Sequence, residues 1–130
     1  MIPGHEKQTH ELTEYEMEKI LPLVVRRMKT KIGKESTVSN RHVVRAFKKC
    51  GYKLTEPRFR KIIQHIRIQG LIDDLISSGN GYNIATTESE MKFYIKSLDK
   101  RINSITLMRD QSQYQMKQMF DQPIDENPFE

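Results

Sequence analysis

The stretch LTEPRFRKIIQHIRIQGLI, residues 54–72, combines an apolar row and a row of cations in one short segment. Its apolar residues recur at spacings of three and four, which predicts a helix with one buried face: Phe59, Ile62, Ile63 and Ile66. Thr55 suits the N-cap, Pro57 the first turn and Gly70 the C-terminal stop. A core needs only the apolar row, so the polar row requires a second explanation.

Positive charge is concentrated around this predicted helix. The chain carries 22 lysines and arginines against 17 acidic residues, a net charge of +5. Fourteen of the basic residues fall within residues 26–70, where Glu35 and Glu56 are the only acids, so this part has a net charge of +12. So large a local excess repels itself, which favours a polyanionic partner over a face that is merely solvated.

A first helix is predicted over residues 13–31. Thr13 and Glu16 form a capping box at its start. Its expected apolar face consists of Met17, Ile20, Leu21, Val24, Met28 and Ile32. Pro22 lies inside this pattern and removes one backbone donor, so we expect a kink or a restart near it.

A second helix is predicted between Ser39, its N-cap, and Gly51, its stop. Its expected inward residues are Val43, Ala46, Phe47 and Cys50. Because Cys50 is the only cysteine, it cannot form an internal disulfide, and its place on the apolar side predicts a buried, inert thiol suited to a reducing cytoplasm. Together with the helix at residues 55–70, this helix predicts a helix-turn-helix unit.

The next stretch, LIDDLISSGNGYNIATT, has the character of strands. Leu75, Ile76, Tyr82 and Ile84 flank a Ser-Ser-Gly-Asn-Gly turn, which predicts a β-hairpin. The order of elements over residues 13–86, with the closing GLI…GYNIAT stretch, resembles the winged helix-turn-helix DNA-binding family, and in particular its small phage and prophage members. The resemblance implies a mainly α (α+β) fold, a three-helix winged helix with a short β-hairpin wing, in which residues 55–70 enter the major groove.

The resemblance and the charge together predict binding to double-stranded DNA. Arg can bind guanine and Gln can bind adenine through paired hydrogen bonds, whereas the cations of the preceding helix suit the phosphate backbone. The predicted DNA-binding residues are Arg41, Arg45, Lys48, Lys49, Thr55, Arg58, Arg60, Lys61, Gln64 and His65. A regulatory, replication or packaging role in a phage or bacterium would follow.

The predicted wing weakens the simplest version of this interpretation. It contains no Lys or Arg, and Asp73 and Asp74 at its base would repel DNA if they faced it. Ile68 and His65 would also suit a protein interface. A winged-helix protein-interaction adaptor without direct DNA binding, in a replication or packaging complex, therefore stays open as the alternative.

Residues 87–120 predict a long helix that follows the winged domain. Thr87 and Glu90 form its capping box, and no Pro or Gly interrupts it before Pro123. Its apolar residues repeat as a heptad seam: Met91, Ile95, Leu98, Ile102, Ile105 and Met116. β-branched residues at a with Leu at d favour a two-stranded coiled coil, hence a homodimer, although Arg109 and Ser112 weaken the second half. A helix that folds back onto its own domain is the alternative.

The two ends lack apolar periodicity. Residues 1–12 are predicted to form a flexible arm, and residues 121–130, DQPIDENPFE, an acidic disordered tail. The tail is similar to the acidic tip of bacterial single-stranded-DNA-binding proteins, which implies a replication or transcription partner protein. Here Glu130 follows Phe129, so the terminal phenylalanine of that tip is missing.

Other classes of function find no support. The longest apolar runs are far shorter than the roughly 18 residues of a membrane span, and the polar, acidic N-terminus is unlike a secretory signal, so we expect a cytoplasmic protein. The histidines have no partners at metal-ligand spacing, and neither a cysteine cluster nor a GxxxxGK[ST] loop occurs. We expect no metal, no cofactor and no enzymatic activity.

Overall fold

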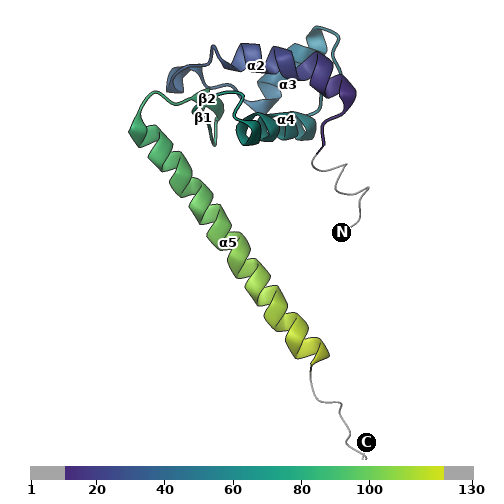
Figure 1. The fold of residues 1–130 in the computed structure, drawn as a ribbon, viewed down its shortest axis with the longest axis vertical. Coiled ribbons are helices and arrows are strands. Elements are labelled where there is room, and N and C mark those ends of the chain that lie inside the picture. The colour runs from purple at the N-terminus through teal and green to yellow at the C-terminus, as the bar shows by residue number, and fades with distance from the viewer. Residues whose placement is uncertain (1–10, 122–130) are drawn as a thin grey trace, which may run out of the picture. The chain divides into compact units, whose positions relative to one another are not determined.

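The computed structural model describes residues 11–121, so most of the predicted arm and tail lies outside the described residues. The chain is mainly helical with a small two-stranded antiparallel sheet (Figure 1), which confirms the expected α+β class. The elements are a π-helical segment Glu16–Ile20, α2 Leu21–Met28, a 3₁₀ turn Lys34–Ser36, α3 Asn40–Lys49, α4 Glu56–Gln69, β1 Leu75–Ser78, β2 Gly81–Ile84 and α5 Glu88–Phe120.

The first helical segment begins at the predicted capping box. The Thr13 amide donates to Glu16 Oε1 (2.8 Å), and the Glu16 amide donates to Thr13 Oγ1 (3.1 Å). The helix is irregular close to Pro22, as expected, because a π-helical segment precedes α2. With this wider turn the buried residues include a row spaced by four: Glu16, Ile20, Val24 and Met28. The inward placement of Met17 and Ile32 was wrong, since Met17 is 42% exposed and Ile32, beyond the helix end, is 58% exposed.

α3 and α4 start and stop at the predicted residues. Ser39 Oγ accepts the amide hydrogen of His42 (3.1 Å), and Thr55 Oγ1 accepts that of Arg58 (3.4 Å). Gly70 ends α4 in the left-handed conformation that glycine adopts without strain. Local capping therefore sets where these two helices begin and where α4 ends.

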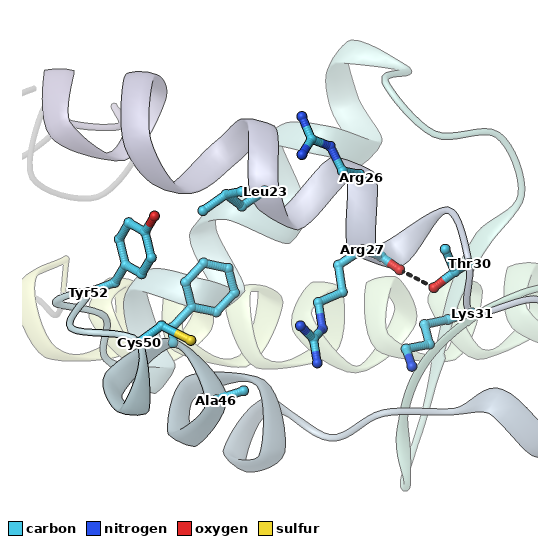
Figure 2. A pocket seen from close by; sticks show the side chains of 9 residues that line it. Leu23, Arg26, Arg27, Thr30, Lys31, Ala46, Cys50 and Tyr52 are labelled. Carbon is cyan, nitrogen blue, oxygen red and sulfur yellow. Dashed lines mark hydrogen bonds between the residues drawn. The ribbon is translucent and has the colours of Figure 1, made fainter.

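Cys50 is exposed, so the prediction of a buried thiol was wrong. It follows Lys49, the last residue of α3, just before the chain turns at Gly51, and Figure 2 shows its sulfur beside Ala46. The apolar position of that last turn is taken by Phe47, whose ring packs edge-on against Tyr52 with centroids 5.7 Å apart. Cys50 is thus the C-cap residue of α3, and its thiol lies at the surface.

The hairpin has a third neighbour that the sequence did not reveal. β1 and β2 pair antiparallel, with Leu75 opposite Ile84. The segment between α2 and α3 runs along the other edge of β2: the Ile84 amide donates to the Lys31 carbonyl (2.8 Å), and Val38 and Tyr82 exchange two backbone hydrogen bonds of 2.8 and 3.0 Å. These bonds tie the hairpin to the segment that leads into α3.

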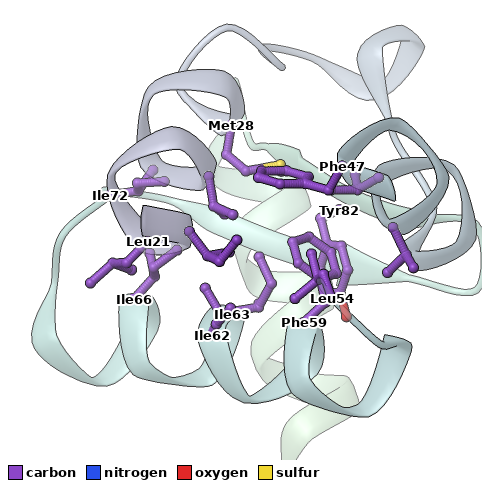
Figure 3. Packing of buried hydrophobic residues seen from close by; sticks show 14 of the residues in the cluster. Leu21, Met28, Phe47, Leu54, Phe59, Ile62, Ile63, Ile66, Ile72 and Tyr82 are labelled. Atoms are coloured by element: carbon purple, nitrogen blue, oxygen red, sulfur yellow. The ribbon is translucent and has the colours of Figure 1, made fainter. Parts of the chain in front are cut away.

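The core lies where α2, α3, α4 and the hairpin converge (Figure 3). Its most deeply buried side chains are Ile20, Val24, Met28, Phe59, Ile62, Ile63 and Ile66. Four of these seven belong to α4, and the Phe59 ring packs edge-on against Tyr82 of β2. The predicted apolar row of α4 is therefore confirmed as the centre of the core, which leaves the polar row outside.

α5 crosses from one compact unit to another, with the boundary between Tyr94 and Ile95. At its start the Glu90 amide donates to Thr87 Oγ1 (3.1 Å), as predicted, while the Glu90 carboxylate accepts hydrogen bonds from Thr86. Tyr94 is buried in the first unit. Within residues 11–121, no helix combines the length and apolar character needed to cross a membrane.

The second unit consists, in its described part, of the remainder of α5. Of the predicted seam, Met91 and Leu98 are half-buried, whereas four residues are 50–61% exposed: Ile95, Ile102, Ile105 and Met116. A lone helix cannot enclose a core, so these apolar side chains are left on its surface.

Candidate nucleic-acid interface

The outer side of α4 is polar because its apolar row is fully used by the core. Lys61, Gln64 and Ile68 stand at i, i+3 and i+7 and so share one side of the helix, flanked by Arg60 and His65. We call these five residues the α4 face. Arg60, Gln64 and Ile68 are exposed, Lys61 and His65 are half-buried, and Lys61 Nζ lies 3.5 Å from Gln64 Oε1. The α4 face thus offers two cations and an amide, the groups that bind phosphates and base edges.

Arg58 is engaged elsewhere. Its Nε and Nη2 donate to the two carboxylate oxygens of Glu16 at 2.8 and 2.5 Å, and Nη2 also donates to the Glu11 carbonyl at 3.0 Å. The Glu16 side chain is only 7% exposed. The hydrogen bond from Arg58 is the main reason that the Glu16 pKa lies below its ordinary value, against the opposing effect of burial. This ion pair fastens α4 to the first helical segment. Because its guanidinium is engaged in the pair, Arg58 is not among the base contacts that we propose.

Arg67 is a second cation of α4 whose side chain contacts other parts of the fold. Its guanidinium carbon lies 5.5 Å from the ring centroid of Tyr82 and 5.3 Å from that of Tyr94. Cation–π contacts of this kind stabilise by about 0.5–2 kcal/mol, depending on how far the cation is desolvated. Arg67 therefore joins α4 to β2 and to the first turns of α5.

α3 carries a second basic row. Arg41, Arg45 and Lys48 stand at i, i+4 and i+7, and all three are exposed, as is Lys49. No carboxylate among residues 11–121 forms an ion pair with any of these four. Thr55, the remaining predicted contact, is exposed and caps α4. The α3 row has the reach and charge for phosphate contacts.

The hairpin contributes no cation to this surface. Residues 75–84 contain no Lys or Arg, and its tip is formed by Gly79 and Asn80. Asp73 and Asp74 are exposed, and the Asp74 carbonyl accepts a hydrogen bond from the Ala85 amide (2.9 Å). The predicted cationic contacts therefore all belong to α3 and α4.

Two structural contacts could not be predicted from the sequence: the Glu16–Arg58 pair, whose partners are 42 residues apart, and the contacts of Arg67 with two tyrosines. The capping box marked Glu16 as important at the helix start, but no sequence signal linked it to α4. No group of three or more potential metal-ligating side chains gathers anywhere in residues 11–121. A scan of family models and searches of curated proteins and of solved structures found no significant match to the chain.

Proposed function

We propose that this chain is a winged-helix protein that binds double-stranded DNA, with α4 in the major groove and α3 along the backbone. The observation that carries the proposal is the division of α4. Its apolar row is fully buried, while its outer side presents Arg60, Lys61 and Gln64 next in the chain to the basic row of α3. A helix that only completed a core would gain nothing from concentrating cations on that side.

The arrangement of strands supports the winged-helix interpretation. The hairpin is held close to the helices, because the segment through Lys31 and Val38, between α2 and α3, hydrogen-bonds to β2. The hairpin would be the wing, and because it is uncharged, we assign DNA contact to the helices.

Lys61 and Gln64 are the proposed base-reading residues, with Arg60 beside them. Gln can donate to and accept from adenine at once, and each good paired contact discriminates by about 1–3 kcal/mol. Arg41, Arg45, Lys48 and Lys49 are the proposed phosphate contacts, and each one lost should lower the salt slope of binding by about one unit.

We further propose that α5 pairs with α5 of a second copy. The heptad residues Ile95 and Ile102 are 50% and 59% exposed, and two such helices would cover them mutually. A dimer would present two α4 faces, as DNA-binding dimers do on half-sites about one helical turn apart. The proposed setting is the cytoplasm, in a regulatory, replication or packaging role in a phage or bacterium.

Fluorescence anisotropy with random duplex DNA at two salt concentrations tests the proposal. The triple variant Arg60→Ala, Lys61→Ala, Gln64→Ala should bind at least about tenfold more weakly, and binding by the parent should weaken steeply with salt. The variant Lys96→Ala, Lys100→Ala removes the same number of charges from exposed positions of α5 and should bind nearly as well as the parent. If the triple variant is folded and binds as tightly as the parent, α4 does not read DNA.

A protein-interaction adaptor is the second candidate, and one observation favours it. Ile68 lies in the α4 face and is 72% exposed, which suits an apolar partner surface. An adaptor should show little affinity for duplex DNA at any salt concentration, so the same titration separates the two functions.

A further inference from the structure

A groove of about 660 Å³ lies between α2 and α3, and none of its lining residues is among those assigned to DNA (Figure 2). Both helices belong to the first compact unit. Its apolar lining includes Leu23, Phe47 and Tyr52, of which Leu23 and Tyr52 are half-buried and pack against the core from outside. The volume lies within the range of about 300–1,000 Å³ that is usual for binding pockets.

The cations of the groove stand apart from its apolar residues. Arg27 is four residues beyond Leu23 in α2, so it lies about 6 Å further along the helix axis, and Lys31 follows the end of the helix. Figure 2 shows Arg27 and Lys31 on one side of the groove and Leu23 and Tyr52 on the other, while Arg26 points away from Arg27. The groove therefore has an apolar end and a cationic end.

The described part of the chain does not neutralise the cationic end. Arg27 is exposed and Lys31 is half-buried, and no carboxylate in residues 11–121 forms an ion pair with either side chain. A guanidinium can bind a carboxylate through two parallel hydrogen bonds, and a neighbouring ammonium group adds further donors. One carboxylate attached to an apolar body would match both ends of the groove at once.

We propose that this groove binds a small aromatic carboxylate, with the carboxylate at the cationic end and the ring at the apolar end. The rings of Phe47 and Tyr52 already pack edge-on with centroids 5.7 Å apart, and aromatic rings favour further contacts of this kind. A single cationic end suits a small molecule better than an acidic peptide, whose carboxylates are spread along its length.

A fluorescent probe tests the binding directly, because the chain contains no tryptophan. Indole-3-acetate is an aromatic carboxylate, and indole-3-acetamide is its uncharged counterpart of nearly the same shape. In anisotropy titrations the full chain should bind the acid with a Kd of about 0.1–1 mM, as expected for a ligand of so few atoms. The amide should bind roughly three- to tenfold more weakly, because it cannot form charge-assisted hydrogen bonds with the cations.

A substitution at the cationic end tests the orientation of the ligand. Arg27→Met keeps an apolar side chain of similar length and should reduce the preference for the acid to about twofold or less. Arg101→Met removes a cation from an exposed position of α5 and should leave the preference unchanged. Circular dichroism of both variants would show that the fold is kept.

Cys50 reports where the probe binds, because it is the only cysteine and lines the groove. N-ethylmaleimide should label it roughly sixfold more slowly when indole-3-acetate is present at about five times its Kd, since only the empty groove leaves the thiol accessible. The proposal is overturned if saturating indole-3-acetate leaves the labelling rate unchanged, or if the acid binds no more tightly than the amide. It is also overturned if labelling slows only with an added acidic peptide or with rising protein concentration, which would show that a protein partner or a second copy occupies the groove.

Discussion

At Glu16 one carboxylate serves two structural purposes. It accepts the Thr13 amide as part of the capping box, and it accepts two hydrogen bonds from the Arg58 guanidinium. The side chain is almost completely buried, so the charge is held by these bonds instead of by water. Removing one partner of a buried ion pair leaves the other partner charged and unpaired, which costs more than the pair itself contributes.

Replacing Arg58 should therefore destabilise the protein more than replacing a neighbouring cation. We expect Arg58→Met to lower the free energy of unfolding by roughly 1–3 kcal/mol, because Glu16 would lose its guanidinium partner while still buried. Arg60→Met, at an exposed position of the same helix, should change it by less than about 0.5 kcal/mol. Urea denaturation of both variants measures the difference, and equal effects would show that the ion pair does not stabilise the fold.

The same carboxylate predicts a dependence of stability on acid. The Glu16 pKa is lowered in the folded protein, chiefly by the hydrogen bond from Arg58, so the folded state binds this proton less readily than the unfolded state. The stabilisation is fully present above the ordinary pKa of 4.5 and is lost as the pH falls through the lower folded value. Denaturation midpoints of the parent should fall more steeply over this range than those of Glu16→Gln, and parallel curves would contradict the assignment.

At the scale of elements, the hairpin depends on one close backbone contact. Gly81, at the start of β2, has φ of +132°, and a Cβ atom there would lie 2.0 Å from the Val38 carbonyl oxygen. Gly81→Ala should therefore separate residues 31–38 from β2 and cost roughly 1–3 kcal/mol or more. Gly79→Ala is the control, because its Cβ would meet nothing within 4 Å. Thermal unfolding compares the two variants. Similar melting temperatures would show that the backbone at Val38 can move away from position 81 without loss of stability.

The elements that the sequence predicted well are those with local signals. Ser39 and Thr55 cap the helices that they were expected to cap, and Gly70 ends α4, because capping depends on residues within one turn. The pairing of residues 31–38 with β2 was not predicted. This segment contains Gly33 and a 3₁₀ turn, and its apolar and polar residues do not alternate as in a strand. The role of Arg58 escaped because its partner lies 42 residues away. Helix caps can be predicted from the sequence because they depend on nearby residues, whereas contacts between residues far apart in the chain depend on tertiary packing.

On the scale of the whole molecule, two parts of different character share one chain. The first unit, residues 1–94, carries 17 lysines and arginines against 11 acids, whereas the second, residues 95–130, carries five against six. The described part of the second unit has no core of its own, and its apolar side chains are exposed. Exposed apolar surface of this extent on a helix marks an interaction site. A second α5 is the partner that we propose, since an interface between identical helices is self-complementary.

A single substitution in the middle of α5 tests this partner. Ile102 is 59% exposed on the isolated helix and would be buried at an a position of the coiled coil. Ile102→Asp would place an unpaired charge in the seam, which should weaken dimerisation by at least about a hundredfold, since 1.4 kcal/mol corresponds to a factor of ten. Asn103→Asp adds the same carboxylate one position away from the seam and should leave the dimer intact. Sedimentation equilibrium at tens of micromolar should report a dimer for the parent and Asn103→Asp, and a monomer for Ile102→Asp. A monomeric parent at this concentration would show that α5 does not pair with itself, and its exposed isoleucines would then need a different partner.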